Sequence, residues 1–579
     1  MTAPENYSGL LKKYLPLLVS LIAVLTYVAT VKFQFVYDDN QQIVGDGLIR
    51  SWQNLPLLFK TDVWRFWNPN VVGNYWRPLF MVWLLVNFQL FGLNPVGWHL
   101  SSILLHAVAT YLCYRVAERV TGDFRIAAGA ALIFAVHPVH IETVAWISGA
   151  TDTLMTVFFL SSLLCFLRAD REKKLRWTLL SALLFACALL CKEPALALPL
   201  AATGCVALFP REGESRRWRQ TGLALALYGA VIVLYFVARN RALVGVTHSR
   251  ILLSAETLLL TWPSLAWFYL RHLLWPGGLA LFYDQPPVLR VDWPHFWLPV
   301  TVIVAVTAAV VAGVRQQLRL AGFALLLLLL PLGPAFFFPA LVPVDYAHDR
   351  YLYLPCFGFA LLAMLCLQRL GNVAEKQLRI RHATVAMVVT VLVGLSVATS
   401  AQVIYFANDL LLFDRATRIA PGSLLAFDGL GRALLVRGQN EQAMLVYRQV
   451  LKIDPYNFSA LYNVGLHDFL HQNYREADLY LSGAFSINPF DPDCSAVLAD
   501  TRNHLGQYAA AEPAIRRAIA LRPGKAGYRR VLAESLGGQG RIEEAIEQVE
   551  AEMQAHPDER NLDQDLLQRL QAQRKSTSK

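Results

Sequence analysis

Two consecutive stretches of 34 residues decide the fold of the C-terminal part: GSLLAFDGLGRALLVRGQNEQAMLVYRQVLKIDP (422–455) and YNFSALYNVGLHDFLHQNYREADLYLSGAFSINP (456–489). Gly431 and Ala443 of the first stretch recur as small residues at the same offsets in the second. Small residues let two helices approach closely, and a proline ends the second helix of each stretch. The two stretches therefore predict two copies of one helical hairpin.

The same period continues to the end of the chain. The closing prolines stand 34 residues apart and are Pro421, Pro455, Pro489, Pro523 and Pro557. A 34-residue period with small residues early and a proline at the end is the tetratricopeptide pattern. We predict about four such repeats in a domain spanning 405–579, which would form a solenoid with a concave binding surface. A passive spacer is the alternative role.

The rest of the chain, 1–404, is strongly apolar. Hydrophobic residues make up 55% of the chain and charged residues 16%, against roughly 25% charged residues in soluble globular proteins. The part after residue 404 has 20 basic and 22 acidic residues, whereas the apolar part has 32 basic and 20 acidic residues. A basic balance beside apolar runs indicates membrane orientation, so we expect membrane lipid and no nucleic acid as a partner. This composition excludes a disordered chain and a single soluble domain.

About eleven segments are apolar enough over about 20 residues to cross a bilayer. They are 14–32, 98–118, 126–144, 152–168, 177–192, 194–209, 220–238, 297–314, 320–338, 353–368 and 383–404. No small-residue cleavage site follows the first segment, so we interpret it as an uncleaved anchor. Two other apolar stretches, 78–91 and 257–274, carry aromatic residues and breaks. We interpret them as interfacial or re-entrant helices on the outer side, the alternative being that both cross.

The basic loops give the orientation, because Lys and Arg concentrate in cytoplasmic loops. With eleven spans they all share the side of Lys12 and Lys13; they are 115–125, 168–176, 211–219, 315–319 and 369–381. We therefore expect a cytoplasmic N-terminus and extracytoplasmic repeats. The expected location is the inner cell membrane with periplasmic repeats, or lumenal repeats in a eukaryote.

Carboxylates gather on the outer side in this scheme. Asp38 and Asp39 directly follow the first span and open the first outer loop, 33–97. Two adjacent carboxylates at a membrane surface can activate a hydroxyl or bind a cation, or they can cap the following loop. The sequence leaves open which of the two would act as a base.

A second group of polar residues ends the third predicted span. His137 and His140, with Glu142 or Asp152, could hold a metal. A His-x-x-His pair with proline inside does not have the i, i+4 spacing of helical ligands. We therefore predict no metal here and favour a polar lining for a substrate pocket, with helix-end packing as the alternative.

Cations also lie on the predicted outer side, against the general trend. Lys192-Glu193 forms a candidate ion pair that interrupts an apolar run, which suits anion binding or a kink. Arg239 and Arg241 open the second large outer loop, 239–296, and Arg350 precedes Tyr351 in a later loop. Basic groups at the outer face could bind a lipid phosphate. The alternative is that they are ordinary solvated charges of a surface loop.

The order of five short motifs, with the trailing repeats, resembles the transmembrane and tetratricopeptide-repeat O-mannosyltransferase family. That family belongs with the protein O-mannosyltransferases of the GT-C glycosyltransferase fold. The motifs are Tyr37-Asp38-Asp39, Trp76-Arg77-Pro78, His137-Pro-Val-His140-Ile-Glu142, Lys192-Glu193 and Asp349-Arg350-Tyr351-Leu-Tyr353-Leu-Pro355. Eukaryotic members usually carry more than four repeats, and Asp349 stands where Glu is expected. These departures leave the sugar and the acceptor open.

The resemblance implies an all-α polytopic membrane protein of GT-C type. It also implies a polyprenyl-phosphate sugar, with mannose expected, as donor, a Ser/Thr hydroxyl of a protein as acceptor, inversion at the anomeric carbon, and no cofactor or metal. We assign Asp38 as the base, with Asp39 as its positioning partner or substitute. For the donor phosphate we choose Arg350 first and Lys192 second, followed by Arg239 and Arg241. The expected pocket residues are Arg77, His137, His140, Glu142, Asp152, Glu193 and Tyr351.

Two other classes of protein remain open. One is a transferase of the same fold that modifies a lipid or glycan, with the repeats recruiting a partner enzyme. The other is a non-enzymatic assembly scaffold or a transporter. A transporter should show internal repeats among its spans and charged residues at the midplane, and the sequence shows neither pattern.

Overall fold

The structure is a computed structural model that describes residues 5–66, 75–210, 214–243, 253–337 and 345–577. Helices make up the regular structure of these residues, with no strand among them. The chain divides into two compact units, Met1–Pro421 and Gly422–Lys579. The boundary therefore lies later than the predicted 404/405, because α16 (Asp409–Ile419) packs with the first unit.

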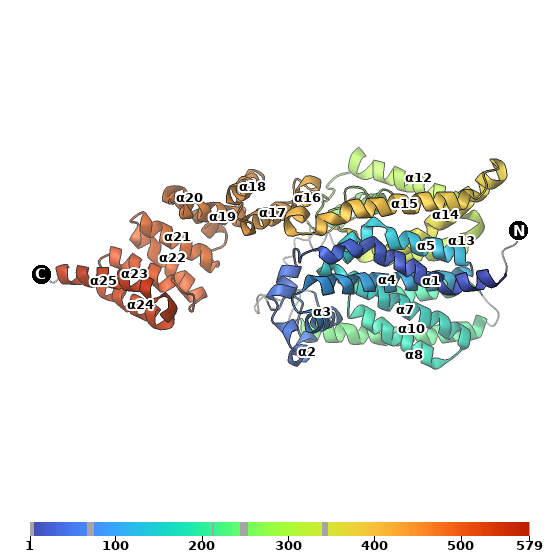
Figure 1. The fold of residues 1–579 in the computed structure, drawn as a ribbon, viewed down its shortest axis with the longest axis horizontal. Coiled ribbons are helices and arrows are strands. Elements are labelled where there is room, and N and C mark those ends of the chain that lie inside the picture. The colour runs from blue at the N-terminus through green and yellow to red at the C-terminus, as the bar shows by residue number, and fades with distance from the viewer. Residues whose placement is uncertain (1–4, 67–74, 211–213, 244–252, 338–344, 578–579) are drawn as a thin grey trace. The chain divides into compact units, whose positions relative to one another are not determined.

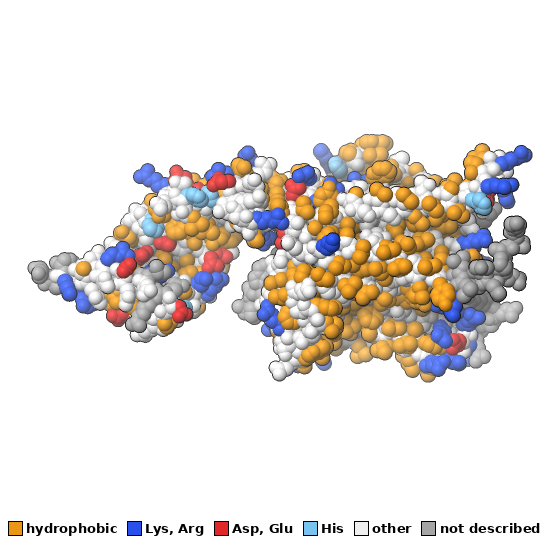
Figure 2. Space-filling view, in the orientation of Figure 1, with side chains coloured by type: hydrophobic (Ala, Val, Ile, Leu, Met, Phe, Trp, Pro, Cys, Tyr) orange, Lys and Arg blue, Asp and Glu red, His pale blue; other side chains and the backbone are white. Residues whose placement is uncertain are grey.

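Helices lying side by side form the first unit (Figure 1). They are α1 (Glu5–Tyr27), α4 (Pro95–Thr121), α5 (Phe124–Val136), α7 (Ala150–Glu172), α8 (Leu175–Leu189), α9 (Leu198–Leu208), α10 (Glu214–Ala242), α11 (Ala255–Leu274), α12 (Leu298–Val314), α13 (Leu318–Leu329), α14 (Pro355–Gln377) and α15 (Ala383–Val403). The first outer loop contains α2 (Leu55–Leu58) and α3 (Pro78–Phe91), and the one-turn helix α6 (Ile141–Val144) follows α5. Apolar side chains cover most of the visible flank of this unit (Figure 2), as expected for a surface facing lipid.

Each of the eleven predicted segments overlaps a helix, but the count of eleven spans is not confirmed. Among the described residues, seven helices are long and apolar enough to cross a bilayer: Lys13–Lys32, Pro95–Thr121, Ile147–Glu172, Arg217–Ala242, Trp293–Val314, Pro355–Gln377 and Ala383–Phe406. The pair Phe124–Val136 and Pro138–Val144, bent by 54°, would be an eighth. The remaining predicted spans correspond to the shorter apolar helices α8, α9 and α13. The stretches predicted to stay at the interface form α3 and α11, and neither is among the seven.

Successive helices that join the two ends of the first unit run in opposite directions. One end carries Asp38, and the opposite end is rich in Lys and Arg. Ser148, just before α7, bonds to Asp39, and Pro355 at the start of α14 lines the same pocket as Asp38. These helices finish at turns rich in Lys and Arg, and Figure 2 shows basic side chains gathered at the end where the chain starts. In the sequence, the helix ends and turns of this kind carry Lys13, Arg119, Arg125, Lys173, Lys174, Arg217, Arg379 and Arg381. The basic turns therefore gather at one end of the unit (Figure 2), although cations such as Arg350 also lie at the end that carries Asp38.

The second unit consists of stacked helical hairpins. Its helices are α17 (Leu424–Val436), α18 (Asn440–Ile453), α19 (Phe458–Leu470), α20 (Tyr474–Ile487), α21 (Pro492–His504), α22 (Tyr508–Leu521), α23 (Tyr528–Gly538), α24 (Ile542–Ala555) and α25 (Arg560–Thr577). A Cβ on Gly431 would lie 2.5 Å from the Tyr447 ring, and one on Gly465 would lie 2.8 Å from Leu481. Ala443 and Ala477 are completely buried between the helices. These close approaches explain why small residues recur, and the predicted repeat solenoid is confirmed.

Candidate active site

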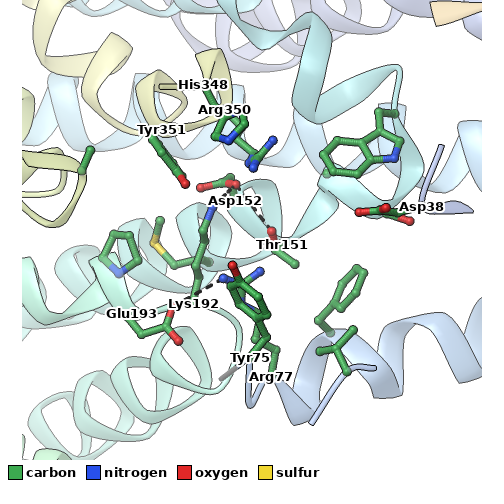
Figure 3. Close-up of a pocket in the computed structure, with 18 of the residues that line it drawn as sticks. Asp38, Tyr75, Arg77, Thr151, Asp152, Lys192, Glu193, His348, Arg350 and Tyr351 are labelled. Atoms are coloured by element: carbon green, nitrogen blue, oxygen red, sulfur yellow. Dashed lines mark hydrogen bonds and ion pairs between the residues drawn. The ribbon is translucent and has the colours of Figure 1, made fainter. Parts of the chain in front are cut away.

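A cavity of about 380 Å³ opens among helix ends and loops of the first unit (Figure 3). Its lining includes eight of the thirteen residues singled out from the sequence: Asp38, Arg77, Asp152, Lys192, Glu193, Arg239, Arg350 and Tyr351. They come from segments far apart in the chain. In Figure 3 Asp38 stands on one side of the cavity, apart from the group formed by Asp152, Lys192 and Arg350. The cavity thus combines a carboxylate on one side with a cationic cluster on another.

A strained turn presents Asp38 to the cavity. Tyr37 has a φ of 51°, which is unfavourable for a bulky side chain and is held only where the surroundings fix it. The backbone N–H of Tyr37 donates to Asp409 Oδ1 over 2.7 Å, and Asn40 Nδ2 donates to Asp409 Oδ2 over 2.9 Å. The Tyr37 ring also contacts the rings of Trp146, Phe282 and Phe413. The first turn of α16 therefore positions the turn that carries Asp38.

Asp39 has a different environment from its neighbour. Its side chain is fully buried and is not part of the cavity lining. It accepts hydrogen bonds from Ser148 N over 2.8 Å, from Ser148 Oγ over 2.6 Å and from Val36 N over 3.2 Å. Burial raises the pKa of this carboxyl to about 7, although these donors oppose the shift. The geometry suits Asp39 as a positioning residue that ties the Asp38 turn to the start of α7.

Arg350 is held from behind by Glu142. The guanidinium forms a short ion pair with Glu142 Oε1, and the backbone N–H of Arg350 donates to Glu142 Oε2 over 2.8 Å. The Arg350 guanidinium also lies over the rings of Trp146 and Tyr351, 5.5 Å from each centroid. Glu142 itself does not line the cavity. Its carboxylate thus orients a cation and does not contact the cavity, which differs from the predicted pocket role.

Lys192 and Glu193 do not pair with each other, so the predicted ion pair between them is wrong. Lys192 Nζ lies 2.5 Å from Asp152 Oδ2 of α7, and Glu193 Oε2 lies 3.6 Å from the guanidinium of Arg77. The break between α8 and the short helix Glu193–Ala197 directs the two adjacent side chains to different partners. Two cross-element pairs therefore join three segments around the cavity.

The two histidines, His137 and His140, are not part of the cavity lining. His137 Nε2 lies 3.0 Å from the carbonyl oxygen of Leu273, and His137 Nδ1 accepts from Val139 N over 3.3 Å. The His140 ring packs 4.4 Å from the Phe134 ring and 4.6 Å from the Tyr353 ring, measured between centroids. Helix-end packing, the alternative interpretation, describes both residues better than a pocket lining. Within the described residues, the cluster with metal-ligand spacing lies in the second unit and involves neither histidine.

Helix geometry separates the two arginines at the end of α10. Arg239 contributes to the cavity lining, whereas Arg241 does not. Residues two apart on a helix point about 200° away from each other, so both cannot face one cavity. The cations of the lining are therefore Arg77, Lys192, Arg239 and Arg350.

Several other lining residues were not predicted from the sequence. Trp64 belongs to the first outer loop, and Pro331 and Pro334 follow α13. Such residues are common in loops, and only the fold brings them together. Asp345 and His348, close before Arg350 in the chain, also line the cavity, with His348 Nε2 3.5 Å from Asp345 Oδ1. Burial raises the pKa of Asp345 to about 6.

Fold and site together define a class: a polytopic helical membrane protein with a charged cavity at one end and tetratricopeptide repeats after it. The family model described as dolichyl-phosphate-mannose-protein mannosyltransferase matches residues 77–240, and the tetratricopeptide-repeat model matches residues 431–467. These matches cover segments of both units.

Several proteins named protein O-mannosyl-transferase match this chain, two of them over most of its length. Protein O-mannosyl-transferase F38B6.6 of Caenorhabditis elegans is 27% identical over 75% of this chain and 62% of its own length. Protein O-mannosyl-transferase TMTC3 of Mus musculus is 25% identical over 86% of this chain and 57% of its own length. Human protein O-mannosyl-transferase TMTC4 is 34% identical over 31% of this chain and 27% of its own length. The chain therefore spans less than two thirds of the length of these relatives.

Among solved structures, the MamA protein aligns with 26% of this chain and 82% of its own length. The sequence identity is 17% and the TM-score 0.24, too low to compare whole folds. The sequence matches confirm the predicted resemblance: the chain is similar to proteins named protein O-mannosyl-transferases and to the tetratricopeptide-repeat model.

Proposed function

We propose that this protein is a GT-C glycosyltransferase that moves a sugar, most simply mannose, from a polyprenyl-phosphate carrier to Ser or Thr hydroxyls of a protein. The observation that carries the proposal is the division of the cavity, with Asp38 on one side and a cluster of cations on another. A lipid-linked sugar phosphate requires both functions, a base at the acceptor and positive charge at the leaving phosphate. The names of the relatives describe the same reaction class.

In the proposed reaction, Asp38 accepts the proton of the acceptor hydroxyl as its oxygen attacks the anomeric carbon. The bond from that carbon to the phosphate oxygen breaks, and the phosphate leaves with the bonding electrons. Arg350, oriented by Glu142, stabilises the charge on the phosphate, with Lys192, Arg77 and Arg239 around it. Attack opposite the leaving group inverts the anomeric centre. These side chains supply the charge stabilisation, so the proposal includes no metal or other cofactor.

Replacement of the proposed base tests the function directly. We expect Asp38→Asn to lower transfer from polyprenyl-phosphate mannose to a Ser/Thr peptide library by about 10²–10⁴-fold, because the amide keeps the size of the side chain but is not a base. The measurement is radiolabel transfer by purified protein in detergent, with gel filtration to show that the variant is folded. Wild-type turnover in both Asp38→Asn and the double variant with Asp39→Asn would overturn the mechanism.

We propose that the cavity faces the extracytoplasmic side. The basic turns lie at the opposite end of the first unit, and such turns remain in the cytoplasm. Nucleotide sugars are cytoplasmic, so a transferase facing outward must use a lipid-carried sugar. A cysteine introduced at Ser576 should therefore react with a membrane-impermeant thiol reagent in spheroplasts, and one at Ser215 should not. The reverse labelling pattern would place the cavity on the cytoplasmic side.

We further propose that the repeats bind the protein acceptor. The repeats expose apolar side chains at equivalent positions, 34 residues apart. Tyr456 and Phe490 follow the closing prolines and are 77% and 68% exposed, and Val436 and Leu470 end the first helix of each repeat. Exposed apolar positions repeated along a solenoid suit an extended segment that binds over many shallow contacts. A transferase acting on a lipid or glycan, or a non-enzymatic scaffold, would need no such surface for a polypeptide acceptor.

A further inference from the structure

Three potential metal ligands from two neighbouring repeats converge in the second unit. Glu441 lies in the first turn of α18, and His467 and His471 lie four residues apart at the end of α19. One ligand atom from each residue lies within 4.8 Å of the other two, and His467 Nε2 is 3.5 Å from Glu441 Oε1. Histidines at i and i+4 share one helix face, which is the spacing used by helical zinc ligands.

A hydrogen bond orients the His471 imidazole for binding, and a nearby carboxylate favours the same tautomer in His467. His471 Nδ1 lies 2.8 Å from the carbonyl oxygen of His467. A carbonyl can only accept, so Nδ1 carries the proton and Nε2 keeps its lone pair. His467 Nδ1 lies 3.8 Å from Asp468 Oδ1, which favours the same tautomer and leaves Nε2 directed at Glu441. Carboxylate and carbonyl groups behind the far ring nitrogen are the usual second partners of metal-bound histidine.

The His467 side chain is poorly satisfied without a ligand. Only 14% of the side chain is exposed, and neither ring nitrogen has a hydrogen-bond partner among the described residues. A buried polar group without a partner costs about 1–3 kcal/mol. This ring thus points a lone pair at a site where a cation would satisfy it.

The residue that follows His471 departs from the repeat pattern in its type, although its backbone conformation does not. Gly438, Gly506 and Gly540 occupy one repeat position with positive φ, whereas the second repeat has Gln472 there, with a φ of 63°. A residue with a side chain is disfavoured in this conformation. The turn that holds His471 therefore differs from its three equivalents at the position beside the cluster.

We propose that Glu441, His467 and His471 bind one divalent transition-metal ion, of which Zn²⁺ is the best match, between the first and second repeats. Imidazole and carboxylate ligands suit Zn²⁺, with water completing a tetrahedron. Tetrahedral ligands around zinc stand about 3.3 Å apart, given bond lengths of about 2.0–2.1 Å. The exposed Glu441 and His471 side chains close the remaining gap by rotation. Such an ion joins α18 to α19 across the repeat boundary and stiffens the first part of the solenoid.

The test is zinc binding by the full-length protein in detergent, made without a polyhistidine tag and stripped with a chelator that is then removed. Titration calorimetry with ZnCl2 should show one saturable site per chain. His471→Ala and Glu441→Gln should each weaken binding by about tenfold or more, a change of about 1.4 kcal/mol or more. Both side chains are exposed, so neither substitution disturbs packing. His467→Ala should do the same, with circular dichroism to show that the repeats remain helical.

A matched control is His504→Ala. His504 also ends a repeat helix and has a carboxylate, Asp500, four residues earlier, but no second histidine. The His504→Ala variant should bind zinc with the affinity of the wild type. Co²⁺ should give the visible absorption of a tetrahedral site in the wild type and not in His471→Ala. The proposal would be overturned if the wild type showed no saturable zinc binding. It would also be overturned if all three cluster variants bound zinc as tightly as the wild type. None of these readouts depends on sugar transfer.

Discussion

At the scale of single residues, two adjacent aspartates differ because their surroundings differ. Asp38 faces the cavity, whereas Asp39 is buried and accepts three hydrogen bonds. A sequence can place both at a membrane surface, but it contains no information on which way each side chain points. The same holds for Lys192 and Glu193, whose partners Asp152 and Arg77 come from other helices and loops.

Asp39 should make stability depend on pH. Burial raises its folded-state pKa to about 7, against about 3.9 for an unfolded aspartate. Between these values the folded protein holds a proton that the unfolded chain has lost, so unfolding free energy falls as pH rises from about 4 to about 7. The melting temperature in detergent should decline over this range, and the decline should be smaller in Asp39→Asn.

A second variant should shift the pH dependence of stability in the opposite sense from Asp39→Asn. Ser148→Ala removes the hydroxyl that donates to Asp39 over 2.6 Å and favours its charged form. The pKa should rise further, so the loss of stability should extend to higher pH than in the wild type. An unchanged pH slope in Asp39→Asn would assign the dependence to other groups.

At the scale of elements, the turn before Asp38 depends on a helix more than 360 residues later in the chain. Asp409 in the first turn of α16 accepts from Tyr37 N and from the Asn40 side chain. The left-handed Tyr37 needs such support. Asp409→Ala should therefore let the turn relax and misplace Asp38. We expect kcat to fall by about 10–100-fold, since a displacement of about 1 Å can cost 10²-fold, with KM for the donor nearly unchanged.

Two variants on the same helix separate positioning from general damage. Asp409→Asn keeps an oxygen for the Tyr37 N–H and should recover much of the activity. Asp414→Ala removes a carboxylate that pairs with Arg418 on the exposed face of α16, and it should leave kcat as in the wild type. Equal loss in Asp409→Ala and Asp414→Ala would show that α16 matters only for folding.

At the scale of the whole molecule, patterns with a period predicted most of the fold. The 34-residue repeat predicted the helices of the solenoid, and the apolar runs predicted the helices of the membrane unit. Close packing of small residues and contact with lipid each leave a local pattern in the sequence. The number of crossings did not follow, since α8, α9 and α13 are shorter than a bilayer requires. The boundary between the units was also missed, because α16 has a repeat-like amphipathic sequence but packs on the membrane unit.

That boundary changes how the repeats should be removed. A chain ending at Pro421 keeps α16 and therefore the support for the Asp38 turn, whereas a chain ending at Ala407 lacks Asp409. We expect the Pro421 chain to retain slow hydrolysis of the lipid-linked sugar, with water as acceptor, and to lose most transfer to a native protein acceptor. In the proposed function the repeats raise the local concentration of acceptor hydroxyls near Asp38, and their removal should abolish this advantage.

The comparison of the two truncated chains completes the argument. Both are measured for donor hydrolysis and for transfer to a short peptide, after gel filtration shows each to be folded. The Ala407 chain should be slower than the Pro421 chain in both assays, because its Asp38 turn is unsupported. Wild-type transfer to the protein acceptor by the Pro421 chain would make the repeats a passive spacer. Loss of hydrolysis in a folded Pro421 chain would instead mean that the repeats complete the catalytic cavity.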